Sequence, residues 1–142
     1  MPRKIVIPVD LSHQESAETA LSHARQFDAD ASFILLHVMP HIPEYYATNI
    51  PSDVLSSQSD NARKALREFA ERNGIFNETQ IVLREGPPGR EILDYAEDTQ
   101  SDLIVMASHD PKWGDMFLGS VAAFVVRHAH CSVFVVRQPT GG

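Results

Sequence analysis

Only one cysteine, Cys131, occurs in the 142 residues, and no glycine occurs before residue 74. A single thiol cannot form an internal disulfide, so the fold must depend on its hydrophobic core. One domain of this length buries roughly 70% of its unfolded surface, which is enough to be stable. No apolar run approaches the roughly 18 residues of a membrane span, and the N-terminal apolar segment is too short for a signal peptide. We therefore expect a soluble, cytoplasmic domain without membrane insertion.

Positive charge is also scarce. The chain has 12 Lys and Arg residues against 19 Asp and Glu residues, giving a formal net charge of -7, and the basic residues are scattered. Such a surface does not attract a phosphate backbone, so we exclude nucleic acid as a partner. The 43% of apolar residues and 22% of charged residues are typical of a globular protein.

Five short apolar runs rich in β-branched residues alternate with segments of helical period. Near-continuous runs of this kind predict strands that are covered on both faces. They lie at 4–9, 32–38, 79–85, 102–108 and 132–137. Strands separated by helices are parallel and joined by right-handed crossovers. We expect one α/β domain over residues 1–142, an open five-stranded parallel sheet with helices on both faces and a long loop at about 39–52.

Helix signals separate these strands. Ser12 and Glu15 match the S-x-x-E capping box, which predicts the start of the first helix. A second helix is predicted from about 52 to 73 and is stopped by Gly74. Two more are predicted at 88–98 and 117–129. The inward-facing apolar residues expected in the first two helices are Ala17, Ala20, Leu21, Ala24, Phe27, Ala62, Leu66, Phe69 and Ala70.

The glycines also narrow the choice of a ligand site. In open α/β sheets the ligand crevice lies at the carboxyl ends of the strands, where the strand order reverses. Because the first crossover has no glycine, a G-x-G-x-x-G dinucleotide loop is excluded there. The turn at 86–89 carries two prolines, which lack N–H donors, and is interpreted as a rigid connection. Gly119 and Ser120 fall within the first turns of the last predicted helix, where free N–H groups attract an anion. A helix cap without a ligand is the alternative.

Several stretches together resemble the universal stress protein family, and they cover essentially the whole chain. They are IVIPVDLS, LLHVMP, EGPPGREIL, DLIVMASHD and LGSVAAFVVRHAHCSVFVVR. The C-terminal block and the Tyr45–Tyr46 pair are most similar to the F/G-type subgroup. The resemblance implies an adenine nucleotide alpha-hydrolase-like fold of Rossmann type, strand order 3-2-1-4-5, ATP as ligand and a homodimer paired through the last strand.

The resemblance also implies which residues form the ATP site. Asp10 would bind the ribose hydroxyls, and Val38 would read the adenine edge through its backbone. Helix capping is the alternative role for Asp10, but Ser12 is expected to fill that role. The remaining nucleotide-binding residues implied are Pro8, Val9, Met106, Ala107, Ser108, His109, Asp110, Gly119, Ser120 and Val121.

This sequence departs from the family's loop pattern, G-x2-G-x9-G-S. Ala107 and Asp110 replace the first two glycines, and eight residues rather than nine precede Gly119. The Asp110 carboxylate either repels ATP or recruits a divalent cation such as Mg²⁺ together with it. Lys112 either offsets that charge or is simply solvated.

Other patterns are less informative. Residues 108–110 contain Ser, His and Asp, but consecutive side chains point in different directions and cannot form a triad. The spacing of His128, His130 and Cys131 matches no zinc signature. Without a placed general base, we expect nucleotide-dependent regulation of a client protein in a stress response, not fast turnover. A slow Mg-dependent ATPase or adenylate-forming enzyme, and a dimeric interaction module without nucleotide, are the alternatives.

Overall fold

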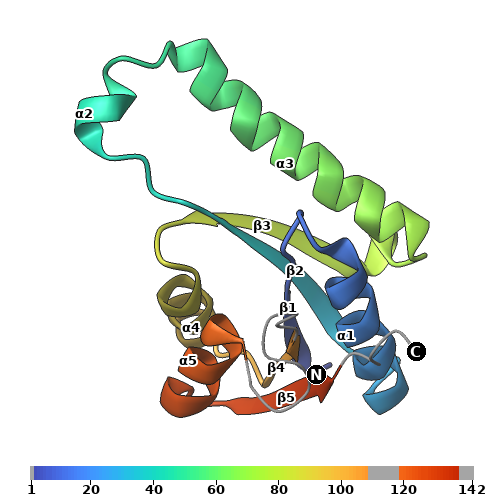
Figure 1. Ribbon diagram of the computed structural model, residues 1–142. Helices are drawn as coiled ribbons and strands as arrows, with labels where there is room; N and C mark the ends of the chain where they lie inside the picture. Colours follow the sequence, from blue (N-terminus) through green and yellow to red (C-terminus); the bar gives the residue numbers. More distant parts are fainter. Residues whose placement is uncertain (1, 109–118, 138–142) are drawn as a thin grey trace, which may run out of the picture.

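The computed structural model describes residues 2–108 and 119–137. Its strands form one sheet in the order β3-β2-β1-β4-β5, and every neighbouring pair is parallel (Figure 1). This arrangement confirms the predicted fold and strand order. The strands are β1 (Lys4–Pro8), β2 (Ser32–Met39), β3 (Thr79–Glu85), β4 (Leu103–Ser108) and β5 (Ser132–Arg137).

Helices cover both faces of this sheet. On one face, α1 (Gln14–Phe27) and α3 (Ser52–Arg72) pack on a core that includes Ile5 and Ile7. On the other face, α4 (Pro88–Asp98) and α5 (Ser120–His128) pack on a core that includes Val6. Because successive strand residues point to opposite faces, the central strands must be apolar throughout. This double burial explains the near-continuous apolar runs of the sequence.

The connection between β2 and α3 contains a short helix, α2 (Glu44–Ala47), which the sequence did not indicate. Its Tyr45 and Tyr46 rings lie edge to face and are 75% and 60% exposed. The buried residues of α3 all lie in its later part, from Ala62 onward, and the first half extends past the sheet (Figure 1). No helix within the described residues is both long and apolar enough to cross a bilayer.

Two predictions about α1 are wrong. The helix begins at Gln14 after His13, and no side chain caps it, so the Ser12–Glu15 capping box does not form. Phe27 ends the helix 53% exposed, although four other expected residues of the helix are buried. Its ring lies against Phe134 of the edge strand β5 and beneath the Arg3 guanidinium. The last turn of α1 is not covered by the sheet. Helical spacing in the sequence does not reveal where that cover ends.

Gly89 is required for the close packing of α4 on α5. A Cβ at this position would lie 2.6 Å from Cδ1 of Phe124. The Phe124 ring is held between Arg90 and His128, so it is not free to move away. We expect Gly89→Ala to lower the free energy of unfolding by about 1–3 kcal/mol in urea titrations, because overpacking outweighs the gain in helix propensity. A more stable variant would show that Phe124 yields easily.

Candidate functional site

A cleft of about 620 Å³ opens at the carboxyl ends of β1, β2 and β4. Because β1 lies between β2 and β4, the chain leaves these strands in opposite directions, and the cleft lies at the switch point of the sheet. Its walls come from the loop after β1, the ends of β2 and β4, and the first turns of α1, α4 and α5. The lining includes Asp10, Leu11, His13, His37, Pro40, Pro88, Ile92 and Ala122.

Most of the expected site residues meet in this cleft, although they come from distant parts of the chain. Those that line it are Pro8, Val9, Asp10, Val38, Met106, Ala107, Gly119, Ser120 and Val121. Ser108 lies at the end of β4, is buried, and is not among the residues that line the cleft. His109 and Asp110 lie outside the described residues, as does Lys112.

Asp10 organises the loop between β1 and α1. Its Oδ1 accepts a hydrogen bond from the Ser12 N–H at 2.9 Å, and its Oδ2 lies 3.2 Å from Nδ1 of His13. This Asx-type turn supplies the local hydrogen bonding that was expected from Ser12. The prediction that Ser12 would cap the helix in place of Asp10 is therefore wrong, and the Asp10 carboxylate has a structural role at the edge of the cleft.

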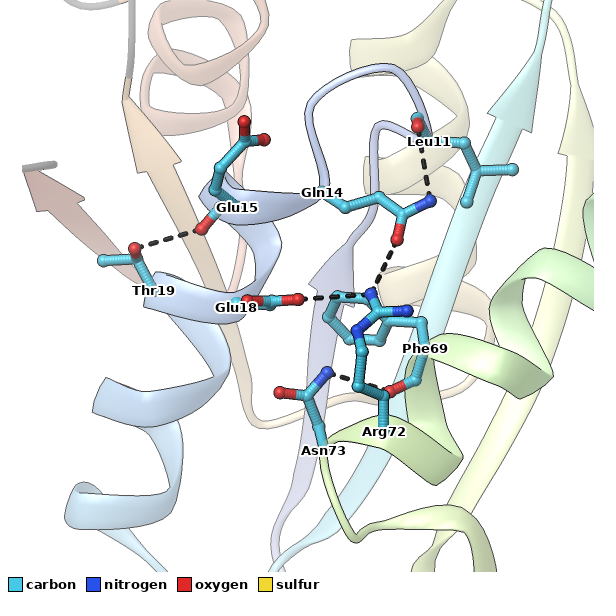
Figure 2. A network of polar contacts seen from close by, with 8 residues as sticks. All are labelled: Leu11, Gln14, Glu15, Glu18, Thr19, Phe69, Arg72 and Asn73. Carbon is cyan, nitrogen blue, oxygen red and sulfur yellow. Dashed lines mark hydrogen bonds and ion pairs between the residues drawn. The ribbon is translucent and has the colours of Figure 1, made fainter.

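Hydrogen bonds connect the junction of this loop and α1 to α3 (Figure 2). Arg72 in the last turn of α3 donates hydrogen bonds to Oε1 of Gln14 at 2.8 Å and to Oε1 of Glu18 at 3.1 Å. The Gln14 amide in turn donates to the Leu11 carbonyl at 3.4 Å. The Arg72 guanidinium also lies over the Phe69 ring. The cleft loop is thus connected through α1 to the helix that covers the same face of the sheet.

The start of α5 presents peptide N–H groups to the cleft. The first backbone hydrogen bond of the helix runs from Ala123 to the Gly119 carbonyl at 2.9 Å, and no side chain among the described residues caps this end. The Gly119 N–H donates to Oγ of Ser108 at 3.0 Å. The N–H groups of the next three residues, 120–122, therefore have no intrahelical acceptor. Together with the helix dipole they favour a bound anion.

Val38 directs its peptide groups into the cleft. In a strand, the N–H and C=O of one residue point to the same side, and neighbouring residues alternate. The Leu36 carbonyl accepts from Val9 on the β1 side, and the Met39 carbonyl accepts from Gly86 on the β3 side. Val38 has the parity of Leu36, so its N–H and C=O face β1. Strand pairing with β1 ends at Leu36, so these groups point past the end of that strand.

His37 was missed by sequence reasoning. Its half-buried ring lines the cleft, and Nδ1 lies 2.8 Å from the Val9 carbonyl oxygen. A backbone carbonyl can only accept a hydrogen bond, so Nδ1 carries the hydrogen. A signal was present, because His37 is the single polar side chain in the run from Phe33 to Met39.

Cys131 lies outside this cleft, just before β5. Burial raises the pKa of its thiol, and the nearby Asp102 carboxylate adds to the effect, so the thiol stays protonated at neutral pH. It packs as a small apolar residue against the core beneath α4 and α5. In the described ranges, no three His, Cys, Asp or Glu side chains gather in a way that would hold a metal ion.

Comparisons with known proteins agree over the whole described length. The model of the universal stress protein family matches residues 1–137. Universal stress protein MJ0531 of Methanocaldococcus jannaschii is 36% identical over 143 residues, covering 96% of this chain and 83% of that protein. Universal stress protein G of Escherichia coli O157:H7 is 29% identical, covering 96% of this chain and all of that protein.

Solved structures share the fold. UspA of Lactobacillus plantarum, at 26% identity, superposes with a TM-score of 0.74 over 95% of this chain and 97% of its own. A universal stress protein in complex with cAMP has a TM-score of 0.69 at 21% identity, covering 94% and 96% of the two chains. An Arabidopsis thaliana member with AMP bound has a TM-score of 0.64 at 17% identity, covering 98% and 94%. Family model, relatives and fold agree, and this chain belongs to the universal stress protein family.

Proposed function

We propose that this protein binds an adenine nucleotide, ATP in particular, in the cleft at the switch point, and that the bound nucleotide regulates a partner in a stress response. The observation that carries the proposal is that one cleft brings together two kinds of backbone groups without a partner among the described residues. The Val38 peptide edge lies at the end of β2, and the start of α5 supplies N–H donors. The AMP and cAMP complexes of proteins with the same fold support this assignment.

Adenine fits the Val38 edge because its donor and acceptor are complementary to that peptide. The Val38 N–H would donate to N1 of the base, and the Val38 carbonyl would accept from the exocyclic amino group. Apolar side chains on either side would cover the ring, including Val9, Ile92 and Met106. Guanine carries an N–H at position 1 and a carbonyl at position 6. It would therefore set donor against donor and acceptor against acceptor.

Calorimetry with ATP, AMP, GTP and GMP tests this function. We expect ATP and AMP to bind and GTP to bind at least about 30-fold more weakly, because a mismatched base leaves polar groups unpaired at a cost of about 1–3 kcal/mol each. Inosine monophosphate is the matched control, since it shares guanine's N1–H and O6 but lacks its amino group. It should bind as poorly as GMP. Equal affinity for all the nucleotides would contradict recognition by the Val38 edge.

With adenine at the Val38 edge, the ribose and the phosphates would also have partners in the cleft. Asp10 would accept hydrogen bonds from the ribose hydroxyls, and the start of α5 would hold the phosphates. Mg²⁺ would accompany ATP, held by Asp110 and the phosphate oxygens. ATP should then bind more tightly with Mg²⁺ than with EDTA. Replacing Asp110 with glycine should raise the metal-free affinity and flatten that dependence. Equal values in all four measurements would remove Asp110 from the site.

The described lining of the cleft favours binding over rapid hydrolysis. Asp10 is the one carboxylate among the described lining residues, and its two oxygens contact the Ser12 N–H and the His13 ring, with lone pairs left for the ribose hydroxyls. A general base must reach the attacking water, and this carboxylate is proposed to serve the ribose. We therefore propose a cytoplasmic regulator whose state depends on bound nucleotide, and not an enzyme with fast turnover.

We further propose that the protein forms a homodimer through β5. This strand has β4 on one side and forms the end of the sheet. Its Phe134 is 37% exposed beside the exposed Phe27 ring. A bare apolar edge strand is an aggregation hazard, and pairing with a second copy removes it. Light scattering at micromolar concentration should report the mass of a dimer, and a monomeric mass would contradict the proposal.

A further inference from the structure

We propose that His37 is a positioning residue that keeps the Val38 peptide free to read the base. This inference rests on the proposed adenine site and concerns how the chain creates its hydrogen-bonding edge. The structural observation is that the ladder between β1 and β2 ends one hydrogen bond before the next step of a regular parallel ladder. His37 lies at that point.

The ladder reaches Val9, whose N–H donates to the Leu36 carbonyl at 2.8 Å. In a regular parallel ladder, the carbonyl of the same residue accepts from the residue two further along the partner strand. That donor would be the Val38 N–H. In the described residues the Val9 carbonyl instead accepts from Nδ1 of His37, also at 2.8 Å. The imidazole thus bonds to the carbonyl that a regular ladder would pair with Val38.

The use of His37 in place of Val38 as the donor to the Val9 carbonyl has a direct consequence for nucleotide binding. If the Val9 carbonyl were available, pairing with Val38 would extend β1 along β2 and occupy the N–H that faces N1 of adenine. A nucleotide would then have to break a backbone hydrogen bond before it could bind. With His37 in place, the Val9 carbonyl is satisfied, and the binding edge is preorganised. The side chain also holds the loop that carries Asp10 against β2.

Three substitutions separate this role from simple packing. Asparagine places an amide N–H near the position of Nδ1, glutamine places its amide near Nε2, and leucine has no donor. We expect His37→Leu and His37→Gln to weaken AMP binding by about tenfold, and His37→Asn to stay within about threefold of the wild type. Equal losses in the Asn and Gln variants would overturn the proposal, because a role in packing makes no distinction between the two amides.

A measurement without nucleotide tests the same inference independently. Amide hydrogen exchange followed by NMR should show the Val38 N–H exchanging at least tenfold faster than that of Val9 in the wild type. In His37→Leu the Val38 amide should become protected by a similar factor, whereas in His37→Asn it should stay fast. The Val9 amide is the internal control, since its bond to Leu36 is retained. Unchanged exchange at Val38 in the Leu variant would overturn the inference.

The two measurements also distinguish this inference from the proposed function. If the exchange pattern is as expected but AMP and ATP do not bind to the wild type, then His37 does hold the edge open and the nucleotide assignment is wrong. If nucleotides bind to all variants equally and Val38 exchange does not change, the site is a nucleotide site and the role of His37 is wrong.

Discussion

Ser120→Asp is expected to weaken ATP binding by about 10- to 100-fold. Ser120 is the first residue of α5, is exposed, and lines the cleft where the N–H groups of 120–122 have no acceptor within the helix. A carboxylate there would lie roughly 5 Å from a bound phosphate, and at an effective dielectric near 20 the repulsion is about 3 kcal/mol before screening. Salt should reduce the effect. Calorimetry should show the largest loss for ATP, a smaller loss for AMP and almost none for adenosine.

The fold should tolerate this charge, so that a loss of ATP binding would not be caused by unfolding. An acidic residue in the first turn of a helix interacts favourably with the dipole, by about 0.3–1 kcal/mol. The thermal midpoint of Ser120→Asp should therefore be equal to or above that of the wild type. Ser120→Asn, which is nearly isosteric and neutral, is the matched control and should bind ATP within about threefold. If the Asp variant binds ATP as the wild type does, the phosphates do not lie at the start of α5.

Phe69→Ala should cost about 3–5 kcal/mol of unfolding free energy. Phe69 is fully buried in α3 and belongs to the core on the α1 face of the sheet. Its ring also supports the Arg72 guanidinium, which connects α3 to α1. The loss is a large part of the roughly 5–15 kcal/mol that stabilises a domain of this kind. Urea unfolding followed by circular dichroism measures it.

Phe76→Ala is the matched control for this experiment. The same ring is removed, but Phe76 is 45% exposed in the short 3-10 turn (Phe76–Glu78) after α3. Its removal should cost less than about 1 kcal/mol, in keeping with exposed positions elsewhere. Similar losses at the two positions would mean that α3 is not held by its buried face.

The strands and the switch point were predictable from the sequence because a strand that is buried on both faces appears as a continuous apolar run. A central strand must be apolar on both faces, and the runs around Val6 and Ile104 are therefore continuous. The ligand crevice then follows from the strand order. Helix ends were less predictable. The capping-box pattern is local, and at the start of α1 the Asp10 carboxylate takes the Ser12 amide first. Phe27 has the right spacing, but the sheet does not reach it.

The candidate site was predictable residue by residue only where a family pattern exists. His37 has no such pattern, because its role depends on register. Its importance appears only when Val9 and Leu36 are seen to be paired and Val38 is seen to lie one step beyond. Sequence periodicity identifies which face a side chain occupies, but it does not indicate where a ladder stops.

The position of β1 in the middle of the sheet has a consequence for how the chain is made. β1 emerges from a ribosome before the other strands of the sheet, yet Ile5 pairs with Leu103 and the Lys4 N–H bonds to the Asp102 carboxylate. Until the chain has been synthesised as far as β4, one side of β1 has no neighbour, and its apolar faces are only partly covered. Closing so long a loop is slow and carries an entropic cost. We expect nascent chains that end before β4 to be prone to aggregation and to depend on chaperones.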